Sequence, residues 1–179
     1  MKKFLSKTYD IVLVSTIIVS ISVILLSALD YAGLVTVRHL KGTSNSPTFS
    51  SNTIALIVSK EPERFNFVTI QKKVLGADGL YKRIIGMPGD TIEIVNGVLY
   101  VNNKVVEEPY ARYLTEEQKL SYNCEKVTLS YDEYYVLGDN RNLSYDSQEF
   151  GPIGTNTVSG VIVWSKDLRN TWLGDMLED

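Results

Sequence analysis

Two short segments hold residues that together could hydrolyse a peptide bond. Residues 42–48 place Ser44 between a glycine and a proline, which restrict the backbone around a small hydroxyl. Residues 80–90 place Lys82 in an expected strand, on the same face as its apolar second neighbours. A lysine on an apolar face loses hydration, and this lowers its pKa. The neutral amine could then take the proton of a serine hydroxyl and make that serine a nucleophile.

A third polar segment, residues 137–147, directly follows an apolar strand. Its many hydrogen-bonding side chains suit the wall of an active site. A calcium loop is the alternative, but Asp139 and Asp146 do not have the spacing of an EF-hand. Each of the first two segments also has an ordinary interpretation when taken alone, a plain loop around Ser44 and a solvent-exposed side chain at Lys82.

Single histidine and cysteine residues narrow the chemistry further. His39 lies five residues before Ser44, an odd offset that puts the two side chains on opposite faces of an extended stretch, so a Ser/His triad is disfavoured. We expect His39 to be solvated near a membrane. Cys124 is alone, which excludes an internal disulfide and a Cys-rich metal site, and we expect a partly buried small side chain. The sequence predicts no cofactor and no metal.

Net charge and chain length limit which classes of function the protein can have. The 179 residues carry 18 basic and 21 acidic side chains, a net charge of −3. No concentrated positive field favours a nucleic-acid partner. The length fits one domain and an additional anchor.

An uncharged apolar run of 19 residues, 11–29, contains no proline or glycine. As a helix it spans about 30 Å, the thickness of a bilayer core. A cleaved signal peptide is the alternative, but its apolar region is about 7 to 15 residues long and ends at a small-x-small site. Lys2, Lys3 and Lys7 precede the run and Asp30 follows it, so the positive-inside rule puts the N-terminus in the cytoplasm.

We therefore predict a cytoplasmic tail at residues 1–10, a transmembrane anchor at 11–33 and an extracytoplasmic domain at 34–179. The stretch around Trp172 could be either a membrane-surface segment or a frayed end.

Short runs of β-branched and aromatic residues between turn residues predict that the outer domain is mostly β. The clearest element is a hairpin over 91–101, closed by Asn96-Gly97. Further strands are expected at residues 54–58, 67–71, 80–85, 104–106, 134–137 and 158–165. Residues 107–126 favour a solvated surface loop, with substrate or partner selection as the alternative.

Taken together, the anchor and the three polar segments resemble type I signal peptidases of the S26 family, as far as about Trp164. The similar motifs are Gly42-x-Ser44-x-x-Pro47-Thr48, Lys82-Arg83-x-x-Gly86-x-Pro88-Gly89-Asp90 and Gly138-Asp139-Asn140-Arg141 with Ser144-x-Asp146-Ser147. The resemblance implies a membrane-bound serine endopeptidase that removes signal peptides from exported preproteins with a Ser/Lys dyad. Its partners would be preproteins and the lipid bilayer.

The resemblance also implies a role for individual residues. Ser44 would be the nucleophile, Lys82 the base, and Ser144 the hydroxyl that orients the lysine. The other residues at positions of the family's motifs are Gly42, Asn45 and Pro47 in an oxyanion hole or substrate pocket, and Arg83, Asp139, Asn140, Arg141 and Asp146 as structural support.

Three positions depart from the family pattern. Asn45 stands where the family has methionine, Gln148 where it has arginine, and Phe150 where it has tryptophan. Without that arginine, we expect Asp146 to turn to another arginine, Arg83 or Arg141. The first two departures motivate an alternative function, a weakly active or inactive signal-peptidase-like factor that assists the assembly of surface pili, with pilus subunits as partners.

Overall fold

The computed structural model describes residues 2–71 and 79–169, with side chains from residue 7 onward. The stretch around Trp172 lies outside the described residues. The chain divides into two compact units, residues 1–36 and 37–179. The predicted boundaries at residues 10 and 33 depend on the position of a membrane and stay predictions.

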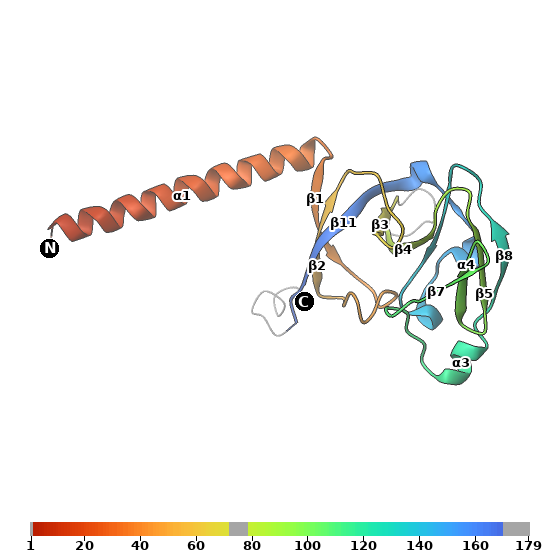
Figure 1. Ribbon diagram of the computed structural model, residues 1–179. Coiled ribbons are helices and arrows are strands. Elements are labelled where there is room, and N and C mark those ends of the chain that lie inside the picture. The colour runs from red at the N-terminus through yellow and green to blue at the C-terminus, as the bar shows by residue number, and fades with distance from the viewer. Residues whose placement is uncertain (1, 72–78, 170–179) are drawn as a thin grey trace. The chain divides into compact units, whose positions relative to one another are not determined.

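The N-terminal unit is dominated by one continuous helix, α1 (Lys2–Tyr31) (Figure 1). Its portion from Lys7 to Tyr31 is long and apolar enough to cross a membrane, by length and composition. Its large apolar side chains are exposed, for example Ile24 at 68% and Ile18 at 58%. Such a surface is unfavourable in water, because its burial in an apolar phase is favourable by about 25 cal/mol per Å².

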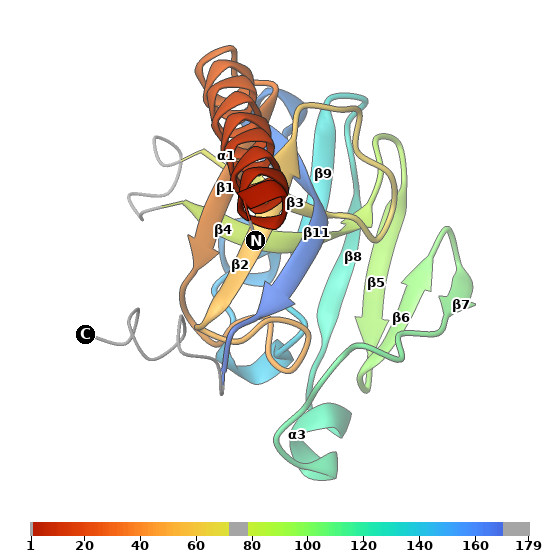
Figure 2. The ribbon, with the colours of Figure 1, turned by 90° about the vertical axis from the view of Figure 1, so that its left-hand side faces the viewer.

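The second unit is mostly β, as the strand pattern predicted, and it is built on two β-sheets. The larger sheet has seven strands in the order β1 (Val35–Leu40), β2 (Thr53–Val58), β11 (Val158–Asp167), β3 (Phe67–Ile70), β4 (Leu80–Gly86), β9 (Glu133–Leu137) and β10 (Ile153–Gly154). The smaller sheet has the order β7 (Lys104–Val106), β6 (Val98–Val101), β5 (Thr91–Val95) and β8 (Cys124–Thr128), and Figure 2 shows these strands side by side. The short helices are α3 (Glu116–Leu120), α4 (Ser147–Phe150) and the 3-10 turns Arg141–Leu143 and Thr155–Thr157.

Strand β9 lies between two hydrophobic cores, and it leads directly into the third polar segment. Its even residues Tyr134 and Val136 join one core, while its odd residues Tyr135 and Leu137 join the other. Alternation along a strand sends successive side chains to opposite faces, so both faces of β9 are covered. The polar segment after Leu137 therefore starts from a strand that is fixed on both sides.

The hairpin over residues 91–101 is confirmed. Val95 pairs with Val98, and both turn residues have positive φ, 50° at Asn96 and 74° at Gly97. A two-residue turn of this kind needs left-handed backbone at both positions, which Asn and Gly adopt at low cost. Local turn chemistry was enough to place these two strands in register.

The segment 107–126 differs from the solvated loop that its polar composition favours. Tyr122 is buried at 7% exposure, and Tyr113 and Tyr110 pack against the same core. The segment also contains α3, whose cap residue Thr115 accepts a hydrogen bond from the Gln118 N–H. The aromatic residues pack this segment against the core of the second unit, while the carboxylates at 107, 116 and 117 are exposed.

Candidate active site

Lys82 is among the most deeply buried polar residues that the structure describes. It lies in β4 opposite Val68 and is 1% exposed. Burial lowers the pKa of its amine, opposed by the negative charges of Asp146, Glu149 and Asp139. Its Nζ atom donates a hydrogen bond of 2.9 Å to Ser144 Oγ. The amine is therefore dehydrated and directed at a hydroxyl, as a base that is neutral near physiological pH requires.

Asp146 completes a polar row with Ser144 and Lys82. It is 1% exposed and accepts hydrogen bonds from the Gly138 N–H at 2.8 Å and the Gln148 N–H at 3.2 Å. Burial raises the pKa of its carboxyl, and these two N–H groups and the Ser144 side chain oppose the rise. The expectation that Asp146 turns to Arg83 or Arg141 is wrong, because backbone N–H groups and a hydroxyl satisfy it without an arginine.

Ser44 lies half-buried in the loop between β1 and β2, and the third polar segment holds this loop in place. The Asn140 N–H donates to the Ser44 carbonyl at 3.0 Å, and Asn140 Nδ2 donates to the Thr43 carbonyl at 3.2 Å. The Thr48 hydroxyl donates to Asp139. Three contacts thus fix the backbone on both sides of Ser44.

Gly138 shows how closely Ser44 and Ser144 approach each other. A Cβ atom at this position would collide with both the Ser144 hydroxyl and the Ser44 carbonyl oxygen. Only glycine fits there, and the two serines lie against the same α-carbon. The described residues contain no hydrogen bond between the Ser44 hydroxyl and Lys82. Catalytic hydrogen bonds are often longer before substrate binds.

The three residues predicted for an oxyanion hole or substrate pocket all belong to the Ser44 loop. Asn45 is 7% exposed, and its Nδ2 donates to the Tyr81 carbonyl at 2.7 Å, next to Lys82. Its Oδ1 is enclosed without a partner among the described residues. Gly42 has a φ of +95° with open space where a side chain would start. Pro47 is exposed and follows a cis peptide bond.

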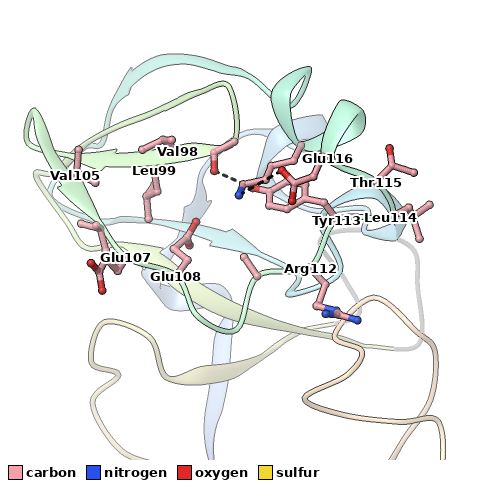
Figure 3. Close-up of a pocket in the computed structure, with 14 residues that line it drawn as sticks. Val98, Leu99, Val105, Glu107, Glu108, Arg112, Tyr113, Leu114, Thr115 and Glu116 are labelled. Carbon is pink, nitrogen blue, oxygen red and sulfur yellow. Dashed lines mark hydrogen bonds and ion pairs between the residues drawn. The ribbon is translucent and has the colours of Figure 1, made fainter.

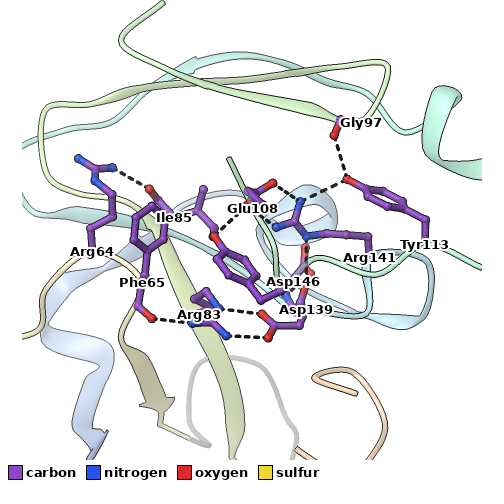
Figure 4. Close-up of polar contacts among 12 residues, drawn as sticks. Arg64, Phe65, Arg83, Ile85, Gly97, Glu108, Tyr113, Asp139, Arg141 and Asp146 are labelled. Carbon is purple, nitrogen blue, oxygen red and sulfur yellow. Dashed lines mark hydrogen bonds and ion pairs between the residues drawn. The ribbon is translucent and has the colours of Figure 1, made fainter. Parts of the chain in front are cut away.

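Arg83 and Asp139 form a buried ion pair beside the site (Figure 4). Arg83 Nε and a terminal guanidinium nitrogen donate to the two carboxylate oxygens of Asp139 at 2.8 and 2.7 Å. The guanidinium also lies over the rings of Phe67 and Tyr110, at 4.1 and 3.9 Å from their centroids. This bidentate geometry fixes the Asp139 carboxylate, which also accepts a hydrogen bond from the Thr48 hydroxyl.

Arg141 is fully buried and pairs with Glu108, a residue that the sequence analysis did not single out (Figure 4). Its guanidinium donates to both Glu108 oxygens, at 2.8 and 2.5 Å, and its Nε donates to the Gly138 carbonyl at 3.1 Å. The buried arginine therefore ties the 107–126 segment to the glycine between the two serines. The charge of Arg141 in the third motif indicates that the chain contains an acidic partner for it. The sequence does not identify which of the acids at 107, 108, 116 and 117 is that partner.

His39 and Cys124 lie outside this row of polar residues. His39 is half-buried in β1, and its Nε2 is enclosed without a partner among the described residues, so the expected solvated position is wrong. The sulfur of Cys124 lies 2.9 Å from the Tyr135 hydroxyl at the edge of a hydrophobic core, which confirms a partly buried small side chain.

Comparisons with known proteins agree with this arrangement. The family model described as "Signal peptidase, peptidase S26" matches residues 11–165. Over 136 residues the chain is 38% identical to signal peptidase I V of Bacillus subtilis (strain 168), a match that covers 69% of this chain and 80% of that protein. It is 32% identical over 147 residues to signal peptidase IB of Staphylococcus aureus, which covers 72% and 76% of the two chains.

A solved structure supports the same relationship. The crystal structure of a signal peptidase I from Enterococcus faecalis V583 superposes with a TM-score of 0.51 at 31% sequence identity, over 57% of this chain and 97% of that one.

Proposed function

Since the chain belongs to the signal peptidase family, peptidase S26, we propose that it removes signal peptides from exported preproteins with a catalytic dyad of Ser44 and Lys82. The single observation that carries the dyad is the geometry of Lys82. Its amine is 1% exposed and lies 2.9 Å from the Ser144 hydroxyl. Burial lowers the pKa of this amine and so favours its neutral form, the form that a general base requires.

The proposed reaction proceeds in two acyl-transfer steps. Lys82 takes the proton of the Ser44 hydroxyl, whose oxygen attacks the carbonyl carbon of the scissile bond. The protonated amine then gives its proton to the leaving nitrogen, and an ester between Ser44 and the signal peptide remains. Lys82 next takes a proton from water, the resulting hydroxide attacks the ester, and the proton returns to Ser44.

The surrounding residues hold these groups in place. Ser144 fixes the direction of the Lys82 amine, and a hydrogen bond to Asp146 holds the Ser144 side chain. The Ser44 N–H would bind the oxyanion, an interaction whose loss typically costs about a hundredfold or more in rate. Gly42 has no side chain that could supply a second donor. Asn45 would form part of the wall of the substrate pocket through its bond to the Tyr81 carbonyl.

The direct test is a cleavage assay with the full-length protein in detergent. The substrate is a preprotein with an Ala-x-Ala site, and a known signal peptidase is run in parallel. We expect cleavage after the last alanine of the site, identified by N-terminal sequencing of the product. Intact preprotein at high enzyme concentration, while the known peptidase cleaves it, would overturn the proposal.

The alternative role in pilus assembly is not favoured by any feature of the described residues. It was motivated by Asn45 and Gln148, but the Asn45 amide is bonded to Tyr81 and the Gln148 N–H donates to Asp146. Neither departure disturbs the row of Lys82, Ser144 and Asp146. Loss of the family's arginine therefore gives no structural reason for loss of activity.

We also propose that α1 anchors the protein in the cytoplasmic membrane with its N-terminus inside. Its apolar portion and the lysines at its start support this orientation. Protease added outside intact protoplasts is expected to digest the second unit and to leave a short membrane-protected N-terminal fragment carrying an added epitope tag. Full protection of the chain until the membrane is lysed would contradict this orientation.

A pH shift on substitution of Glu149 tests whether Lys82 is the base. The charge of Glu149 raises the pKa of Lys82, so Glu149→Gln is expected to lower that pKa further. Activity requires the neutral amine, so the acidic limb of the kcat/KM profile should move to lower pH. Glutamine preserves the capping contact in which Glu149 accepts the Asp146 N–H.

The matched control for this shift is Glu117→Gln, which neutralises an exposed carboxylate of α3 that does not influence the Lys82 pKa. Profiles are measured at low ionic strength, where charge interactions at the surface are least screened. An unchanged limb in Glu149→Gln, or a movement to higher pH, would argue against Lys82 as the titrating group.

A further inference from the structure

A cavity of about 270 Å³ lies directly beside the nucleophile loop. It is lined by Ser46, Pro47, Arg112, Tyr113, Leu114 and Asn140. Ser46 and Pro47 follow Ser44 within three residues, and the Asn140 N–H holds the Ser44 carbonyl. A peptide bound at Ser44 therefore has this cavity within reach of its neighbouring residues.

Among the described residues that line this cavity, Arg112 has the only cationic side chain. Its backbone is fixed, because its N–H donates to the Asp139 carbonyl at 2.7 Å and its carbonyl accepts from the Arg141 N–H at 2.9 Å. Its guanidinium is exposed, and within the described part of the chain it has no hydrogen bond or ion pair. Figure 3 shows the guanidinium turned away from Glu107 and Glu108.

Several other arginines, unlike Arg112, are paired with carboxylates. Arg64 pairs with Asp90 at 2.7 Å, and Arg83 and Arg141 have bidentate carboxylate partners. Two acids that contact this part of the chain pair with other arginines, since Asp139 binds Arg83 and Glu108 binds Arg141. A guanidinium recognises a carboxylate through two parallel N–H donors. The unpaired charge at the cavity therefore suits a carboxylate from outside the chain.

The polarity of the surface on the two sides of Ser44 indicates which part of the substrate supplies this carboxylate. On the Lys82 side, Leu40 and Phe49 flank the Ser44 loop and belong to one apolar cluster, against which the partly buried Tyr81 packs. This apolar side suits the small residues that end a signal peptide. The cavity around Arg112 is polar and suits the first residues of the mature protein. We propose that it is a subsite for an acidic side chain just after the scissile bond.

This inference rests on the proposed function and specifies the class of preprotein that is cut fastest. The test uses three preproteins that are identical except at the first two residues after the cleavage site, which are both Glu, both Gln or both Lys. The wild-type full-length protein is expected to cleave the Glu substrate about 3- to 10-fold faster in kcat/KM than the Gln substrate, and the preference should decline with added salt.

Variants of Arg112 assign this preference to the guanidinium. Arg112→Gln is expected to cleave the Glu and Gln substrates equally well, and Arg112→Glu to prefer the Lys substrate. Arg169→Gln, which removes an exposed arginine paired with Asp167, should keep the wild-type preference. Circular dichroism should show that the Arg112 variants fold, because the exposed side chain has no partner within the described residues.

The outcomes separate this inference from the proposed function. Cleavage of all three preproteins at equal rates by the wild type would refute the subsite and leave the peptidase intact. A preference for Glu that persists in Arg112→Gln would also refute it. No cleavage of any preprotein would refute the proposed function and the subsite together.

Discussion

Lys82→Met and Ser44→Ala are each expected to reduce kcat for preprotein cleavage by at least about 10³-fold. Methionine has nearly the length of lysine but cannot accept a proton, so Ser44 would remain a neutral, weak nucleophile. Alanine at position 44 removes the attacking oxygen itself. Single-turnover cleavage of an Ala-x-Ala preprotein by the full-length variants measures both effects. The double variant should be no slower than either single variant, because the two residues act as one unit.

Stability measurements distinguish a catalytic lysine from a structural one. The pKa of Lys82 is lower in the folded than in the unfolded chain, so the unfolded chain binds more protons below the ordinary lysine pKa of about 10.4. This contribution to folding becomes less favourable as pH falls toward the folded pKa. Lys82→Met removes this cost, and we expect an unfolding free energy about 0.5 to 2 kcal/mol higher near neutral pH.

Exposed residues of the same types provide the controls. Ser51→Ala changes an exposed serine in the loop that carries Ser44, and Lys104→Met changes an exposed lysine of β7. Both variants should cleave like the wild type. If Lys82→Met retained substantial cleavage, or lost activity only because it unfolded, Lys82 would not be the base.

The strands that sequence analysis placed correctly are those with local signals. The hairpin at Asn96-Gly97 combines turn chemistry with alternation, and the predicted strand at 80–85 matches β4. Strand β1 was missed because it directly follows the apolar helix and carries Arg38 and His39 in its middle. Strand β8 was missed because Glu125 and Lys126 interrupt its apolar pattern.

The same division between local and distant interactions applies to the candidate site. Alternation along one strand put Lys82 on an apolar face, and the resemblance of the three motifs then favoured a base over a solvent-exposed side chain; Lys82 is buried. No local pattern predicts that Gly138 separates the Ser44 loop from Ser144, because that contact joins residues about 100 positions apart. Nor does the sequence show that Asp146 is bound by backbone N–H groups instead of an arginine. Tertiary packing determines which of several chemically equivalent residues form these contacts.

Glu108→Gln is expected to lower the free energy of unfolding by about 3 to 5 kcal/mol. The Arg141 side chain is 0% exposed, and glutamine would leave its charge buried without a counter-charge. Urea denaturation of the full-length protein in detergent, followed by circular dichroism, measures the loss. Glu107→Gln is the matched control, because it changes the exposed neighbouring carboxylate and should shift stability by no more than about 0.5 kcal/mol.

A double variant separates the charge of Arg141 from its contact with the site. Glu108→Leu combined with Arg141→Met removes both charges, and apolar replacement of a buried ion pair is often neutral or stabilising, so most of the lost stability should return. Cleavage should not return, because no Nε donor would hold the Gly138 carbonyl next to Ser44 and Ser144. Full activity in the double variant would show that Arg141 serves only stability. A double variant as unstable as Glu108→Gln would show that the unpaired charge is not the cause.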